Sequence, residues 1–158
     1  MKQLLTILLF STSSYAFCFQ EAAAYYGVHP SLLYAIAKVE SNFHPYAINV
    51  NSGGKSLRSY YPKTKEEAIY IIKELERRGY NNYDVGIGQI NSRNIKRYNL
   101  KVENLLDPCY NLHMSAFILR KNIDTYGYNW KAIYKYNGNP SYAWKIYREL
   151  KKMEVAKR

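Results

Sequence analysis

The sequence is poor in cysteine, histidine and acidic residues. Two cysteines and three histidines occur in 158 residues, and 12 Asp and Glu stand against 23 Lys and Arg. The cysteines and the scattered His29, His44 and His113 lack the spacing of metal ligands, so the sequence predicts neither a metal site nor a cofactor. After the first sixteen residues no apolar run is long enough to span a bilayer.

The shortage of acids leaves a formal net charge of +11. Such a balance favours acidic partners, which include nucleic acid, an anionic membrane surface and an acidic polymer such as cell wall. The basic residues are spread along the chain, and the only run is the C-terminal tail with Lys151-Lys152 and Lys157-Arg158. No aromatic-basic module or helix-turn-helix pattern is present, so we expect no nucleic-acid partner.

The first sixteen residues have the pattern of a secretory signal peptide. Met1-Lys2 supplies a positive start, Leu4 to Phe10 is apolar, and Ser14-Tyr15-Ala16 places small residues at a cleavage site after Ala16. We therefore expect residues 1–16 to be removed and residues 17–158 to form one mature domain in the periplasm or outside the cell. There, Cys18 and Cys109 are expected to form a disulfide worth about 4–5 kcal/mol in the chain-entropy model.

Local patterns predict a mainly helical single domain of the α+β type with a small central extended element. Residues 46–61 are expected to be a loop followed by a short strand or extended arm at 57–61, and residues 83–91 a short strand or turn. Capping residues and apolar repeats at helical spacing predict helices within 18–26, 29–42, 64–79, 92–98, 107–127 and 130–136, and from 141 onward.

The stretch 32–41 carries the most unusual feature. Leu33, Ile36 and Ala37 form one apolar face, and Glu40 continues it at i+7 from Leu33. Taken alone, such a Glu is more often a helix-end residue that turns to solvent. If it is desolvated, however, it holds its proton to higher pH, as a carboxylic acid that donates a proton near neutrality must.

Four motifs, read together, resemble a known family. They are Glu40-Ser41, the run 86–91 (Gly-Ile-Gly-Gln-Ile-Asn), Asp107-Pro108 with Asn111, and the run 134–138 (Tyr-Lys-Tyr-Asn-Gly). Their order resembles the soluble lytic transglycosylases (SLT), which are related to goose-type lysozymes. The resemblance is closer to the small secreted branch that accompanies type III and type IV secretion and conjugation systems. It covers about residues 18–147 and implies a lysozyme-like fold.

The resemblance implies cleavage of the β-1,4 bond between N-acetylmuramic acid and N-acetylglucosamine in peptidoglycan. Glu40 matches the single catalytic glutamate. It would protonate the glycosidic oxygen and then, as carboxylate, accept the proton of the muramoyl C6 hydroxyl while that oxygen closes onto C1 to give a 1,6-anhydro sugar. The glycan strands, and components of an envelope-spanning machine, would be the partners.

The same resemblance assigns five further residues to substrate binding. Ser41 would orient the acid and the sugar, and Gln89 would line the cleft. Asn91 would donate to an acetamido group or only cap the next helix. Tyr136 would lie close to the acid, and Asn137 would bind sugar.

Two glycines of the second motif, Gly86 and Gly88, would let the backbone pass beside a sugar. Members of the family often have a bulkier residue, commonly Met, at the position of Gly88. The small secreted branch accepts Gly or Met there.

Three other functions stay open. A lysozyme-type hydrolase would need a second carboxylate placed for water, and Asp84 is the only one near a motif. A wall-binding or assembly component could retain the fold without catalysis, although a binder has no need of an acid on a buried face. A secreted basic protein that binds nucleic acid is supported by charge alone.

Overall fold

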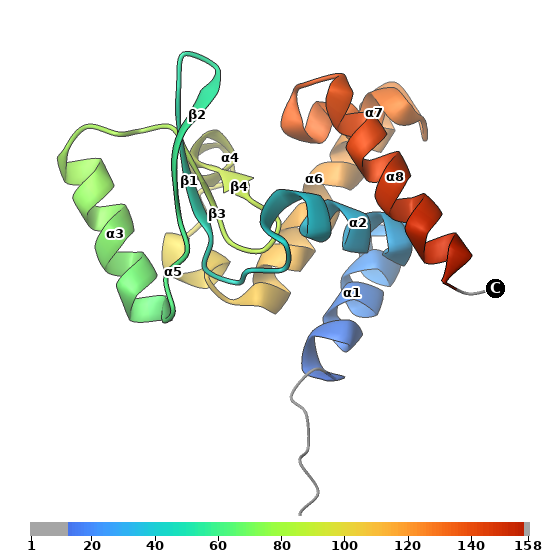
Figure 1. The fold of residues 1–158 in the computed structure, drawn as a ribbon, viewed down its shortest axis with the longest axis horizontal. Coiled ribbons are helices and arrows are strands. Elements are labelled where there is room, and N and C mark those ends of the chain that lie inside the picture. Colours follow the sequence, from blue (N-terminus) through green and yellow to red (C-terminus); the bar gives the residue numbers. More distant parts are fainter. Residues whose placement is uncertain (1–12, 157–158) are drawn as a thin grey trace, which may run out of the picture.

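The computed structural model describes residues 13–156, in which eight helices accompany one four-stranded antiparallel sheet (Figure 1). This confirms the predicted mainly helical, lysozyme-like class. The helices are α1 (Ser13–Tyr26), α2 (Pro30–Ser41), α3 (Lys65–Arg77), α4 (Ser92–Arg97), α5 (Val102–Leu105), α6 (Pro108–Tyr126), α7 (Trp130–Asn137) and α8 (Ser141–Val155). The strands are β1 (Ile48–Ser52), β2 (Lys55–Tyr60), β3 (Tyr83–Val85) and β4 (Ile90–Asn91).

Two hydrophobic clusters divide the interior. The larger one joins α1, α2, α6, α7 and α8 around fully buried residues such as Leu33, Leu119 and Ile146. The second lies between the sheet, α3 and α5, with Val85 and Ile72 at its centre. Figure 1 shows α3 on the opposite side of the sheet from α2, α7 and α8, so the sheet separates α3 from the main helical body.

Helix α2 begins and ends where its sequence predicts. The His29 ring accepts a hydrogen bond from the Ser31 amide at 3.2 Å, and Pro30 occupies the first turn, where a missing N–H is tolerated. Asn42 closes the helix in the left-handed conformation. The apolar face of α2 (Leu33, Ile36 and Ala37) is completely buried, and the helix packs against α1, α6 and α8.

The segment 46–61 is a β-hairpin, which corrects the predicted loop and single strand. Strand β1 was missed. Ser52 pairs with Lys55 across a two-residue turn at Gly53-Gly54, where both glycines have positive φ, as hairpin turns that match strand twist require. The strand order β2-β1-β3-β4 makes the exposed strand β2 one edge of the sheet.

Both chain ends differ in detail from expectation. Helix α1 starts at Ser13, inside the predicted signal peptide, whose residues 1–12 lie outside the described residues. Helix α8 continues to Val155, so Lys151 and Lys152 are helical, and 157–158 lie outside the described residues. Within residues 13–156 no helix has the length and apolar character needed to cross a membrane.

Candidate active site

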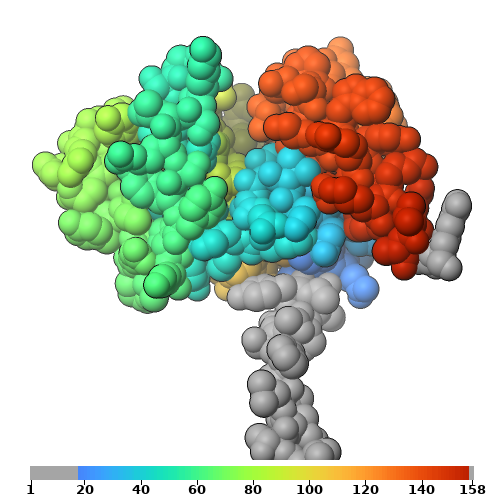
Figure 2. Space-filling view, viewed as in Figure 1, coloured from blue at the N-terminus to red at the C-terminus, as the bar shows by residue number. Residues whose placement is uncertain are grey.

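A cleft of about 680 Å³ separates the sheet from the helical body. Figure 2 shows it as a hollow between the β1–β2 hairpin side and the α7–α8 side. The sheet contributes polar side chains to one wall, and the C-terminal end of α7 contributes Tyr136 and Asn137 to the other. Glu40 lies among the lining residues, so the last turn of α2 meets the cleft with its carboxyl.

Glu40 is the acid that α2 brings to the cleft. It retains partial exposure through the cleft, while protein atoms surround its carboxyl. The pKa of Glu40 is raised from 4.5 to about 8. Burial is the largest cause and the negative charge of Asp84 adds to it, while the Tyr142 hydroxyl and the Lys145 ammonium oppose the rise. The resting carboxyl is therefore protonated at neutral pH, as a general acid must be.

Two tyrosines enclose the acid. Tyr136 donates its hydroxyl hydrogen to the Gly88 carbonyl at 2.8 Å, and its ring is parallel to that of Tyr142, with centroids 6.4 Å apart. Burial raises the pKa of both hydroxyls, so both stay protonated. The Tyr142 hydroxyl completes no hydrogen bond of standard geometry within residues 13–156, yet it lies near enough to stabilise the charged form of Glu40.

The loop 86–89 is fastened from three helices. Ser41, at the end of α2, donates to the Ile87 carbonyl at 2.8 Å, and Tyr136 of α7 reaches Gly88. Asn111 of α6 is fully buried and accepts from the Gly88 amide at 2.8 Å while donating to the Val85 and Leu105 carbonyls. The loop therefore fixes the position of the acid helix relative to the cleft.

Gln89 and Asn91 lie where the sequence places them, in the cleft wall. Gln89 adopts a left-handed backbone, and its side-chain amide donates to the Ala47 and Gly86 carbonyls, both at 2.9 Å. These bonds leave its carbonyl oxygen to meet a ligand. Asn91 caps α4 by accepting from the Arg93 amide, as one of its two predicted alternatives has it, and its amide nitrogen donates to Asp84 at 2.7 Å and to Asn82 at 3.0 Å. The other alternative, donation to an acetamido group, stays a prediction.

Four of the five predicted binding residues meet Glu40 in the cleft, and the fifth does not. Ser41 is buried behind the wall and bonds to backbone, which makes it a positioning residue. Tyr142 was missed. On α8, Tyr142 lies one turn before buried Ile146 and faces the acid, whereas Tyr147 is 37% exposed. The i, i+4 pair with Ile146 was the signal available.

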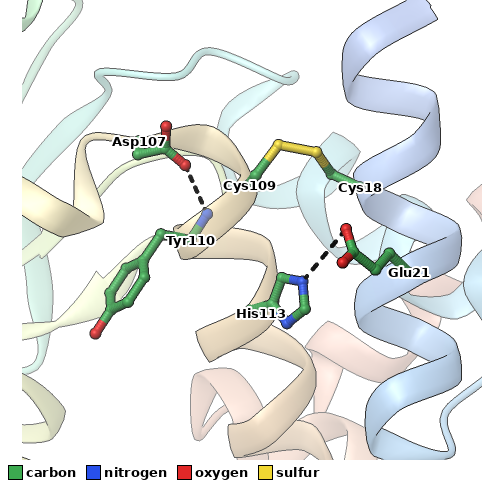
Figure 3. Close-up of a disulfide and its surroundings, with 6 residues drawn as sticks. All are labelled: Cys18, Glu21, Asp107, Cys109, Tyr110 and His113. Atoms are coloured by element: carbon green, nitrogen blue, oxygen red, sulfur yellow. Dashed lines mark hydrogen bonds and ion pairs between the residues drawn. A yellow bond between two sulfur atoms is a disulfide. The ribbon is translucent and has the colours of Figure 1, made fainter.

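The disulfide between Cys18 and Cys109 joins α1 to the start of α6, with Cα atoms 5.3 Å apart (Figure 3). This confirms the pairing expected from the sequence. Beside it, Asp107 caps α6 by accepting from the Tyr110 amide at 2.8 Å, and His113 lies 3.9 Å from Glu21 of α1. The disulfide thus fastens α1 to α6, and α1 also packs against the acid-bearing α2.

A small sheet and a helical body that enclose one buried carboxylic acid define a lysozyme-like domain. The sequence model of the Transglycosylase SLT domain family matches residues 17–157, and the chain belongs to that family.

The chain is also similar to curated proteins of other bacteria. The chain is 41% identical to "Type IV secretion system protein virB1" of Brucella abortus biovar 1 (strain 9-941), over 58% of this chain and 37% of that protein. It is 38% identical to "Protein virB1" of Agrobacterium fabrum, over 58% of this chain and 36% of that protein. It is 30% identical to "Invasion protein IagB" of Salmonella typhimurium (strain SL1344), over 94% of this chain and 86% of that protein. The match therefore spans less than two fifths of either virB1 protein.

Proposed function

We propose that the protein is a lytic transglycosylase that cleaves the β-1,4 bond between N-acetylmuramic acid and N-acetylglucosamine in peptidoglycan. The observation that carries the proposal is Glu40, a carboxylic acid with its pKa raised to about 8 in a cleft of about 680 Å³. Membership of the SLT domain family supports the substrate class.

One carboxyl serves both chemical steps. Glu40 gives its proton to the glycosidic oxygen, which keeps the electron pair of the breaking C1–O bond and leaves as a hydroxyl. The resulting Glu40 carboxylate then accepts the proton of the C6 hydroxyl as that oxygen bonds to C1. The product is a 1,6-anhydro sugar, and Glu40 regains its starting protonation state.

The wall residues have separate tasks in this proposal. The Gln89 carbonyl oxygen and the exposed Asn137 amide contact sugar hydroxyl and acetamido groups, and Asn91 borders the same surface. Tyr136 holds the loop 86–89 by its bond to Gly88 and excludes water from one side of the acid. Ser41 acts through the loop and not on the sugar.

Hydrolysis of the same bond is the second candidate, because Asp84 supplies a second carboxylate in the cleft. The two reactions leave different ends. Transglycosylation gives anhydro-muropeptides, whereas hydrolysis gives reducing-end sugars that are 18 Da heavier by one water.

We also propose that the mature domain, residues 17–158, works in the periplasm beside a secretion or conjugation machine. The family match begins at residue 17, the disulfide suits an oxidising compartment, and one relative is named a type IV secretion system protein. N-terminal sequencing of the exported protein should begin at Phe17, and a start elsewhere would refute cleavage after Ala16.

The experiment that tests the activity compares oxidised wild-type protein with its Glu40→Gln variant on purified peptidoglycan. Mass spectrometry of the soluble fragments should find anhydro-muropeptides with wild type and none with the variant. Reducing ends alone would replace the lyase by the hydrolase, and no release by folded wild type would refute both.

A further inference from the structure

Helix α8 carries a row of large side chains on its solvent side. Its inner side is closed by Tyr142 and Ile146, which are buried in the larger hydrophobic cluster. Trp144, Tyr147 and Val155 are 68%, 37% and 71% exposed, and their spacings of three and eight residues bring them to the opposite side of the helix. Figure 1 shows α8 at the outer edge of the helical body, away from the sheet. A surface helix of a globular domain ordinarily has polar residues on this side, so the row calls for a function.

Three aromatic rings on this surface contact one another. The Tyr147 ring meets the rings of Trp130 on α7 and Trp144 on α8, with centroid distances of 5.9 and 5.6 Å. We call these three residues the aromatic patch. They include both tryptophans of the chain, and none of them lines the cleft. The aromatic patch is therefore a surface separate from the candidate active site, and contiguous exposed apolar side chains of this kind mark interaction sites.

Basic side chains accompany the aromatic patch along α8. Helix α8 has four Lys and Arg against two Glu, and Arg148 and Lys151 share its solvent side with Tyr147. The Lys151 ammonium lies 5.8 Å from the centre of the Tyr147 ring and also pairs with Glu154. In the part of the chain from 13 to 156, no carboxylate lies within salt-bridge distance of Arg148. The aromatic patch thus faces solvent beside a surplus of positive charge.

This combination of residue types suits the surface of an anionic bilayer. Tryptophan and tyrosine favour the boundary between acyl chains and headgroups, because one end of each ring system is apolar and the other can hydrogen-bond. Lysine and arginine lay their apolar stems along that boundary while their charged ends reach the lipid phosphates. The formal net charge of +11 attracts the whole protein to the same surface.

The ring geometry is less suited to a sugar strand. A sugar stacks on the open face of an aromatic ring, and a strand of sugars needs several ring faces in one plane. In the aromatic patch the planes of neighbouring rings are inclined by 79° and 89°, so the rings offer no common plane. Lipid acyl chains are fluid and need no such plane.

We propose that the solvent side of α8, together with Trp130, is a docking surface for a bilayer that contains anionic phospholipid. Trp144, Tyr147 and Val155 enter the boundary between headgroups and acyl chains. Arg148 binds lipid phosphate from the same side of the helix. The attachment is peripheral and reversible, because only a few side chains enter the lipid.

Docking leaves the candidate active site accessible. Tyr142, which interacts with Glu40, and the residues that enter the lipid lie on opposite sides of α8. The protein can therefore hold a glycan in the cleft while α8 rests on a membrane. The inference goes beyond the proposed function and does not depend on it, since lipid binding needs no acid.

The test uses the two tryptophans as reporters, because both belong to the aromatic patch. The exported, oxidised protein is titrated with vesicles of equal parts phosphatidylethanolamine and phosphatidylglycerol, and with vesicles of phosphatidylcholine as the neutral control. With the anionic vesicles we expect tryptophan emission to move to shorter wavelength and the protein to sediment with the lipid. Added salt should weaken both effects. The neutral vesicles should give neither.

Variants place the contact on α8. We expect Trp144→Gln to weaken sedimentation with anionic vesicles by about 10-fold, through loss of apolar burial, and Arg148→Gln to weaken it by about 5-fold, through loss of one charge. The matched controls are Tyr70→Gln and Lys73→Gln, which remove an exposed ring and an exposed charge from α3. Both controls should bind like wild type. All four positions are exposed, and circular dichroism checks that each variant is folded.

The outcomes separate this proposal from the proposed function. Glu40→Gln should bind vesicles like wild type, and Trp144→Gln should release the same muropeptides as wild type, so either proposal can fail alone. No emission shift and no sedimentation with anionic vesicles would refute lipid docking, and so would equal binding by Trp144→Gln. An emission shift with soluble peptidoglycan fragments or with polyglutamate, but not with vesicles, would assign the aromatic patch to a glycan or to an acidic protein and overturn the inference.

Discussion

Replacement of Glu40 by glutamine should stabilise the folded protein at pH 8 and leave its stability nearly unchanged at pH 5. The pKa of Glu40 is 4.5 in its ordinary environment and about 8 in the fold. Between these values the folded protein holds a proton that the unfolded chain has released. The free energy of unfolding therefore falls as pH rises through this window. Glutamine has the same shape and no proton to lose, so the variant escapes this penalty.

The magnitude follows from the width of the window. One proton bound only by the folded state changes the free energy of unfolding by about 1.4 kcal/mol per pH unit. From pH 5 to pH 8 the full effect would be about 4 kcal/mol, and partial ionisation at both ends lowers it to about 3.5 kcal/mol. Wild type should lose this amount relative to Glu40→Gln.

The assay is urea unfolding of both oxidised proteins at pH 5 and pH 8, followed by circular dichroism. Glu66→Gln is the control, because Glu66 is exposed on α3. Its stability relative to wild type should differ little between the two pH values. If the free energy of unfolding of Glu40→Gln relative to wild type is also the same at pH 5 and pH 8, the fold does not raise the pKa of Glu40. The acid–base argument then fails.

Three further changes test other parts of the site. Tyr142→Phe should move the alkaline limb of the pH–rate profile to higher pH, because the hydroxyl that lowers the pKa of Glu40 is gone; an unmoved limb would deny that contact. Gly88→Ala should lower the free energy of unfolding in urea by about 1–3 kcal/mol, since a β-carbon there would overlap α6 and force the loop to shift; an unchanged midpoint would contradict the tight packing. Serine at both Cys18 and Cys109 should cost about 4–5 kcal/mol in the same experiment, because the disulfide closes a loop with a sequence separation of 91; a loss below about 1 kcal/mol would refute the chain-entropy account.

Helices with local signals were predictable to within a few residues. Thr64 accepts from the Glu67 amide at 3.1 Å, and Asn129 accepts from two amides at the start of α7, as their capping patterns predict. Such signals act within one turn of chain, so the sequence contains all that is needed to find them. The position of Glu40 on α2 was predictable in the same way, because the apolar residues before it show which face of the helix it shares.

Strand β1 was hidden because its stabilising partners are distant in sequence. Asn49 and Asn51 face the cleft, where their amides bond to Asp84 more than thirty residues away. Asparagine is depleted in ordinary strands, so the segment looked like loop. The two-residue Gly53-Gly54 turn was the local signal that could have revealed the hairpin. Tyr142 escaped for a similar reason, since its meeting with Glu40 depends on how α8 packs on α2.

The loop 86–89 is held by side chains that have no part in the proposed reaction steps. Ser41, Asn111 and Tyr136 come from three helices, and each bonds to the backbone of this loop. Gly88 has no β-carbon, so α6 can approach closely enough for Asn111 to accept from the Gly88 amide. A β-carbon at this position would collide with Ser115. A bulkier residue at position 88 would therefore require a compensating change on α6. Packing between these helices and the loop 86–89 therefore sets where the Glu40 carboxyl meets the cleft.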